Sequence, residues 1–545
     1  MASAAAPESY AFAPEERPVF PGSPYSPTHP PLRRVGYALI ALLTGITSNL
    51  VNSMVTVNLP NLAGAMGLYV AQVAWFPAVY VAFNATANLT LVRARIQFGI
   101  PAVMHFLLVI YGAAVVYQLI LPSFPVALFT RAMCGMTMAA LSTITLYNLM
   151  QVFSAKTRPL ALLIGISIPQ LGLALARLIP VEALALDGWR GLHLIELGLI
   201  LAVMASTIAL PVPPTDRTKA FEPFDAITIG LMVPGFLLVC AVLSVGRYLW
   251  WTDTPWLGVA LAAAVPLLAA AILFEHFRAR PLIQTRWIGT ADMLRFALIA
   301  FVVRVALAEQ TYGSVGLLTL GGLINDQLHL LFMLVVLAMI AGVVVAALTL
   351  KPDRIPLQIM AASLCIALGA WMDTDVSNLT RPPQLYASQM LIAFGTTLFI
   401  GPSLLFGILR VLQRGPEYLV TFVVLFSATQ NLGGLAGSAL LGSLQYDRVR
   451  YYTAMLSQYL DAGNPIVVQR LQAGAAAVSG VIVDPAQRTA QGGALLSQAL
   501  AREANLLAFA DVFRAVALIA LANAVYLAIR ILVVQRLDAQ KKATA

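Results

Sequence analysis

Residues 33–60 read RRVGYALIALLTGITSNLVNSMVTVNLP. Two arginines precede an uncharged, mostly apolar run that is long enough to cross a bilayer, since a membrane-spanning helix needs about 20 such residues. The same arrangement, a basic flank followed by a long uncharged run, recurs along the rest of the chain. The stretch therefore predicts an all-α integral membrane protein.

The composition agrees with this prediction. Of the 545 residues, 60% are hydrophobic and only 10% are charged, whereas soluble domains carry roughly 25% charged residues. The net charge of +9 comes from 33 Lys and Arg that lie between the apolar runs rather than in one patch. This distribution is typical of membrane topology signals and argues against a nucleic-acid partner.

Fourteen membrane spans are expected, arranged 6+2+6. They cover residues 36–59, 69–92, 100–120, 125–150, 159–180 and 191–212, then 226–249 and 256–277, and finally 292–313, 328–350, 356–372, 384–409, 418–444 and 510–535. Alternate connections carry the Lys and Arg, as cytoplasmic loops should; the main exceptions are Arg190, Arg247 and Arg381. Because a miscounted span would invert this alternation downstream, we expect both termini to be cytoplasmic.

The spans imply a domain organisation. The expected parts are a disordered cytoplasmic tail over 1–33, a six-helix bundle over 34–212, two extra helices with linkers over 213–291, a second bundle over 292–535 and a cytoplasmic tail over 536–545. The first tail is rich in proline and has almost no aliphatic run, so it cannot bury enough apolar surface to fold. Residues 445–508 separate the last two spans, and their mixed polar and apolar pattern predicts a helical hairpin outside the membrane.

Several motifs resemble one family, the EmrB-type drug:proton antiporters among the fourteen-spanners of the major facilitator superfamily. The similar residues are Val55 to Pro60, Trp75, Tyr80, Arg131, Gly135, Trp189-Arg190, Glu275, Arg280 to Ile283 with Arg286, Gly395, Gly401-Pro402 and Asn431 to Gly437. The resemblance covers nearly the whole chain after the tail. It implies the major facilitator fold, proton-coupled export from the bacterial inner membrane without a cofactor, and a tripartite pump with a periplasmic adaptor and an outer-membrane channel.

The sequence departs from that family where proton coupling is concerned. The family usually has an Asp in the first span, and Val51 stands at that position, with Asn52 beside it. Ile96 stands where the loop after the second span usually has an Asp. The coupling group must therefore be sought elsewhere in this chain.

Ionisable residues inside a span are costly and are functional candidates by default. Glu309 and Glu196 are the candidate proton-coupling residues. The candidate substrate-binding residues are Arg131, Arg304, Asn52 and His193. Glu196 and His193 are three positions apart and so share a helix face. An alternative interpretation makes Arg131 a structural partner of Glu196.

The resemblance, taken with these residues, implies a secondary active transporter that exports small amphipathic compounds. The arginines favour hydrophobic weak acids as substrates, and lipophilic cations bound by the carboxylates are the alternative. An enzyme is not expected: the sequence has no phosphate-binding G-x-x-x-x-G-K-[ST] loop, its five histidines have no metal-ligand spacing, and Cys134, Cys240 and Cys365 indicate neither a disulfide nor a metal site. The competing function is a non-transporting receptor or assembly protein with a transporter fold.

Overall fold

The computed structural model describes residues 16–18, 22–461 and 463–544 of the chain. Within these ranges the regular secondary structure is entirely helical. Thirteen helical stretches there are long and apolar enough to cross a membrane. The prediction of an all-α, multi-pass membrane protein is therefore confirmed.

The chain forms two compact units. Unit 1 contains the described residues up to Ala300 together with Ile340–Ile359 and Thr397–Leu432, and unit 2 contains Phe301–Met339, Met360–Thr396 and the described residues from Gly433 onward.

The long helices of unit 1 follow the expected first eight spans. They are α1 (Pro31–Val57), α4 (Trp75–Phe98), α5 (Ile100–Ile120), α6 (Phe124–Val152), α7 (Arg158–Ser167) continued by η3 (Ile168–Gln170) and α8 (Leu171–Ala176), α9 (Val181–Ala209), α10 (Asp225–Leu249) and α11 (Pro255–Phe277). Proline at one of the first two positions begins α1, α5, α6, α7 and α11, where its missing N–H costs no helical hydrogen bond.

Five further helices contribute residues to both units. They are α13 (Ala291–Ala306), α15 (His329–Leu348), α16 (Ile355–Met372), α17 (Pro382–Arg414) and α18 (Leu419–Ser457). Short helices and turns complete the connections: α2 (Leu59–Ala65), α3 (Val70–Val73), η2 (Ala155–Thr157), α12 (Thr285–Ile288), η5 (Asn325–Leu328), η6 (Pro352–Arg354), η7 (Asp373–Asp375) and η8 (Pro416–Tyr418).

The ninth expected span, over 292–313, is interrupted. Helix α13 ends at Ala306, and a single turn of π-helix, η4 (Glu309–Gly313), precedes α14 (Ser314–Leu320). No part of this segment is a continuous helix long enough to count among the thirteen stretches. The break falls at Glu309, one of the candidate residues, and π turns are frequent at functional sites.

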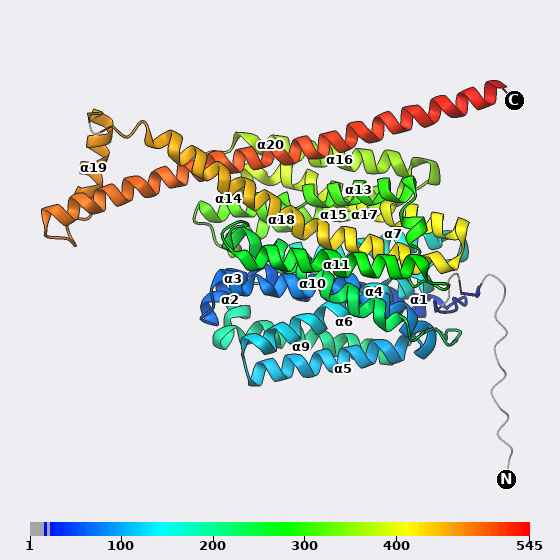
Figure 1. The fold of residues 1–545 in the computed structure, drawn as a ribbon. Coiled ribbons are helices and arrows are strands. Elements are labelled where there is room, and N and C mark those ends of the chain that lie inside the picture. Colours follow the sequence, from blue (N-terminus) through cyan, green and yellow to red (C-terminus); the bar gives the residue numbers. More distant parts are fainter. Residues whose placement is uncertain (1–15, 19–21, 462, 545) are drawn as a thin grey trace, which may run out of the picture. The chain divides into compact units, whose positions relative to one another are not determined.

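The predicted hairpin between the last two spans is helical, and it extends the flanking helices. Helix α18 continues to Ser457, α19 (Pro465–Ala477) follows, and α20 (Pro485–Thr544) begins well before the expected span at 510. Figure 1 shows α19 beside the first turns of the long α20, with which it packs. A Cβ atom on Gly492 would lie 2.6 Å from the carbonyl oxygen of Leu471, so this close approach requires glycine.

Part of the N-terminal tail lies within the described residues and makes hydrogen bonds. Residues 1–15 and 19–21 of the tail that was predicted to be disordered lie outside the described residues. Beyond them, the Tyr25 N–H donates to the Pro214 carbonyl at 3.1 Å, Gln151 Nε2 donates to the Tyr25 carbonyl at 3.1 Å, and His29 Nε2 lies 3.0 Å from Gln151 Oε1. Hydrogen bonds to unit 1 thus hold a segment whose own apolar surface is too small to fold it.

Candidate functional site

The first group of buried charges is the Arg131–Glu196 cluster in unit 1, which consists of Tyr111, Gln118, Arg131, His193 and Glu196. Arg131 on α6 is 2% exposed and Glu196 on α9 is fully buried. Arg131 Nη2 donates to Glu196 Oε1 at 2.6 Å, and the Tyr111 hydroxyl donates to the same oxygen. The interpretation of Arg131 as an ion-pair partner of Glu196 is therefore confirmed.

The other carboxylate oxygen is also bonded. Glu196 Oε2 lies 2.9 Å from His193 Nδ1, and His193 Nε2 lies 3.1 Å from Gln118 Nε2. A carboxylate accepts and an amide nitrogen donates, so His193 fits as the neutral tautomer with its proton on Nδ1. One polar atom of the cluster, Arg131 Nη1, is buried without a hydrogen-bond partner. Glu196 thus has both a compensating charge and a partner on each oxygen.

The second group is the Glu309–Asp373 pair in unit 2, bridged by Gln389. Glu309 begins the π turn η4, Asp373 follows the last residue of α16, and Gln389 lies on α17. Their side chains are 0%, 1% and 1% exposed. Gln389 Nε2 donates to Glu309 Oε1 at 3.1 Å and to Asp373 Oδ2 at 2.8 Å.

Neighbouring polar groups hold the bridging amide in place. Ser314 Oγ donates to Gln389 Oε1 at 3.2 Å, and Gln310 Nε2 donates to the Gln389 backbone carbonyl at 3.3 Å. Glu309 Oε2 is buried without a hydrogen-bond partner. Among the residues that the structure describes, no basic side chain forms an ion pair with Glu309 or Asp373. This pair is therefore an uncompensated acidic site.

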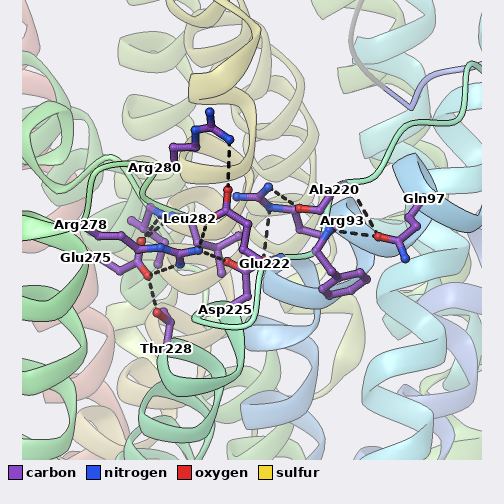
Figure 2. Close-up of polar contacts among 12 residues, drawn as sticks. Arg93, Gln97, Ala220, Glu222, Asp225, Thr228, Glu275, Arg278, Arg280 and Leu282 are labelled. Carbon is purple, nitrogen blue, oxygen red and sulfur yellow. Dashed lines mark hydrogen bonds and ion pairs between the residues drawn. The ribbon is translucent and has the colours of Figure 1, made fainter.

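A third group lies at the ends of the two extra helices and is shown in Figure 2. We call it the Arg278 network. Arg278 follows α11, and its guanidinium lies 2.8 Å from Glu222 Oε2, 2.8 Å from Asp225 Oδ1 and 3.1 Å from Glu275 Oε1. Glu275 also accepts from the backbone N–H groups of Leu282 and Ile283.

Arg93, at the end of α4, joins this network. Its Nη1 donates to the Ala220 carbonyl at 2.6 Å, and its Nε lies 3.8 Å from Asp225 Oδ2. Burial alone would lower the pKa of Arg278, but its hydrogen bonds to Glu222, Asp225 and Glu275 outweigh that effect and raise the pKa. The guanidinium therefore stays charged, and the network ties α10 and α11 to the end of α4.

No protein-family model matches the sequence, and no curated protein matches it. Solved structures do. The human organic anion transporter MFSD10 (TETRAN) superimposes with a TM-score of 0.50 at 16% identity, over 77% of this chain and 95% of that one. The proton:xylose symporter XylE of the major facilitator superfamily also has a TM-score of 0.50, at 13% identity, over 90% of this chain and 95% of its own.

The chain has the major facilitator fold. The predicted fold class is therefore confirmed, while the closer resemblance to EmrB-type exporters stays a prediction. At such low identity the likeness concerns the fold alone, so the roles of individual residues have to be argued from this chain's own contacts.

Within this major facilitator fold, the predicted site residues separate. Arg131, Glu196 and His193 come together in unit 1. Asn52 lies half-buried on α1 and shares no described hydrogen bond with them. Arg304 lies half-buried on α13 in unit 2, where a Cβ atom on Gly433 would come within 2.8 Å of its Cβ atom. Glu309 lies in the uncompensated pair.

Sequence reasoning missed Asp373 and Gln389, and it named Glu275, Leu282 and Ile283 of the Arg278 network only as part of a family resemblance. Asp373 lies one residue beyond the expected span 356–372, so it is not among the intramembrane charges that mark the candidate residues. Gln389 lies inside the span 384–409 but is uncharged, so a search for intramembrane charges does not select it. The sequence Asp373-Thr374-Asp375 gave a weak signal. An acidic residue directly after an apolar run can be buried inside the protein as well as exposed to water.

Proposed function

We propose that this protein is a secondary active transporter that exports small amphipathic molecules in exchange for protons. The observation that carries the proposal is an uncompensated buried carboxyl pair, Glu309 and Asp373, in a chain with the major facilitator fold. Both similar structures are described as transporters, of organic anions in one case and of xylose with a proton in the other. Those descriptions support the class of function proposed here.

Glu309 is a better proton carrier than Glu196. A coupling group must gain and lose its proton during the cycle, so its environment must tolerate both forms. Glu196 is tied to Arg131, Tyr111 and His193, and protonating it would leave a buried guanidinium without its counter-charge. Glu309 accepts a hydrogen bond from the neutral amide of Gln389, and its Oε2 has no hydrogen-bond partner, so neither form breaks an ion pair.

The substrates proposed are hydrophobic weak acids, with Arg131 as the residue that meets the acidic group. The free Nη1 donor of Arg131 supports this, because a buried unpaired donor gains from any acceptor that reaches it. Since Glu196 already balances the charge of Arg131, the gain from an anion is a hydrogen bond rather than a full ion pair. Lipophilic cations, the alternative, would have to bind at the acidic pair.

The test uses purified protein in proteoliposomes with an imposed pH gradient, with one anionic and one cationic dye as probes. We expect proton-driven movement of the anionic dye, its loss in Glu309→Gln, and its weakening in Arg131→Lys. Proton-independent binding without movement would indicate the competing receptor function. Movement that remains proton-driven in Glu309→Gln would refute the coupling assignment, and preference for the cationic dye would refute the substrate class.

We further propose that the protein lies in the bacterial inner membrane with both termini cytoplasmic, and that the α19–α20 hairpin docks a periplasmic adaptor linked to an outer-membrane channel. The basic residues of alternate loops support the orientation. The helical hairpin supports the docking, because long structured loops are usually functional.

Two adjacent glycines allow the docking proposal to be tested without deleting the hairpin. Gly492→Leu introduces a side chain where a Cβ atom already meets Leu471 O at 2.6 Å, so it separates α19 from α20, whereas a Cβ atom on Gly493 meets nothing within 4 Å. We expect Gly492→Leu to lose export from whole cells but keep transport in proteoliposomes. Gly493→Leu is the control and should keep both. Equal whole-cell export by the two variants would contradict the docking role.

A further inference from the structure

Glu309 and Asp373 are held close together by one donor. Because Gln389 Nε2 donates to an oxygen of each, at 3.1 Å and 2.8 Å, those oxygens are no more than about 6 Å apart. Each carboxyl comes from a different element, η4 and η7, and the amide between them comes from α17. The closeness of the two groups is therefore built by three separate segments of unit 2.

The pair lacks positive charge. Both side chains are at most 1% exposed, so water does not solvate them. Neither forms an ion pair with any described basic residue, and Glu309 Oε2, fully buried, has no partner at all. An isolated buried carboxylate is strongly disfavoured, and two carboxylates this close also repel each other. The missing positive charge must therefore come from a bound proton or cation.

Hydrogen-bond chemistry favours a proton. Gln389 presents its NH₂ group to both carboxyls, and its oxygen is already occupied by Ser314 Oγ. Such an amide satisfies carboxylate acceptors but offers a metal ion no oxygen ligand. The unpartnered Glu309 Oε2 provides a position where a carboxyl proton can reside.

We propose that Glu309 and Asp373 form a two-carboxyl site that shares one proton, with Gln389 as the positioning residue. This inference deepens the proposed function, on which it rests, because the shared proton would be the coupling ion. It adds Asp373 as an equal partner of Glu309. The two carboxyls lie on different elements, η4 and η7. Gain or loss of the proton therefore changes the electrostatic repulsion between these elements, which links the proton to movement in the transport cycle.

The experiment counts protons directly and requires no substrate. Purified protein in lipid nanodiscs at neutral pH is examined by infrared spectroscopy for the C=O band of protonated carboxyl groups. Four proteins are compared: wild type, Glu309→Gln, Asp373→Asn and the double variant. Sharing predicts that each single variant keeps the one protonated carboxyl, because the remaining acid takes the proton, and that the double variant loses it.

Other patterns would overturn the inference. Loss of the band in Glu309→Gln alone would assign the proton to Glu309, and loss of two carboxyls in the double variant would show two independent sites. Replacing a bulky organic cation in the buffer by Na⁺ should leave the wild-type band unchanged; its disappearance would assign the site to a metal cation. Glu182→Gln, at an exposed carboxyl in the first turn of α9, is the control and should leave this band unchanged.

Folding is checked for every variant by size-exclusion chromatography. If a variant does not fold, wild-type protein labelled with ¹³C-carboxyl glutamate is measured instead. A shared proton predicts that the protonated-carboxyl band shifts only in part, because Asp373 is unlabelled. A complete shift of the band would overturn sharing. The count is independent of transport. One shared proton without proton-driven flux would refute only the proposed function, whereas coupled flux with the proton on Glu309 alone would refute only the sharing.

Discussion

Glu196 in unit 1 and Glu309 in unit 2 are the same residue type, lie on long apolar segments and are both fully buried. Glu196 makes hydrogen bonds with the guanidinium of Arg131, the hydroxyl of Tyr111 and the imidazole of His193. Glu309 receives one amide hydrogen bond and lies close to a second acid. Burial alone therefore does not reveal what an intramembrane carboxyl does.

The difference lies in charge compensation. A buried ion pair opposes any change in protonation, because neutralising one partner strands the other in a medium that cannot solvate it. An uncompensated acid has no such constraint and must itself be neutralised by a bound proton or cation. We interpret the Arg131–Glu196 cluster as a fixed element of the helix packing and the Glu309–Asp373 pair as the variable one.

The largest expected effect comes from breaking the compensated pair. Arg131→Met removes the charge that balances Glu196, and we expect a loss of roughly 3–5 kcal/mol in stability. Thermal unfolding in nanodiscs measures it. The double variant Arg131→Met/Glu196→Leu should recover most of the loss, since it leaves no stranded charge. A single variant as stable as wild type would mean that the ion pair does not hold these helices.

The Arg278 network should respond similarly but less. Arg278→Met strands three carboxylates, one of which is 30% exposed and can be hydrated, so we expect a loss of about 2–3 kcal/mol. Arg280→Met is the matched control: Arg280 is 87% exposed and lies 3.9 Å from Glu222, and its loss should cost no more than about 0.5 kcal/mol. Equal losses in the two variants, measured by thermal unfolding, would contradict the network's role.

The smallest effect on stability is expected at the uncompensated pair. Glu309→Gln is nearly isosteric and removes no ion pair, so stability should change by no more than about 1 kcal/mol. Its effect should appear instead as loss of proton-driven flux in proteoliposomes. Glu196→Gln should have the opposite effects. It should destabilise the fold, because it leaves Arg131 without its counter-charge, and the protein that still folds should keep proton-driven flux. If both variants behaved alike in both assays, the comparison would fail.

Particular residues show how far sequence reasoning reached. The spans were found because about 20 consecutive apolar residues have few alternatives to a membrane helix. Three residues apart on one helix, His193 and Glu196 could be placed on one face, and the structure joins them at 2.9 Å. Arg131 is 65 residues away in sequence, and its interpretation stayed open between partner and free cation until its contact with Glu196 was known.

Other features had almost no signal. The break in the ninth span lies at one turn of π-helix with the polar sequence EQTYG, and polarity alone does not distinguish a π turn from an α-helical turn. Asp373 and Gln389 come together with Glu309 from positions 64 and 80 residues further along the chain. Likewise, Arg278 contacts acids from two segments, Glu222 and Asp225 near the start of α10 and Glu275 near the end of α11, and in sequence these charges resemble ordinary loop residues.

By itself, the sequence determined the class of molecule, the course of its helices and the presence of buried charges, because the bilayer imposes length and polarity on each span independently of the others. Only the tertiary structure decided which charges are compensated. Compensation depends on contacts between side chains a few ångströms apart, and the chain brings those together from distant positions. For this protein that choice separates Glu196, held by Arg131, from Glu309, which faces Asp373 without a counter-charge.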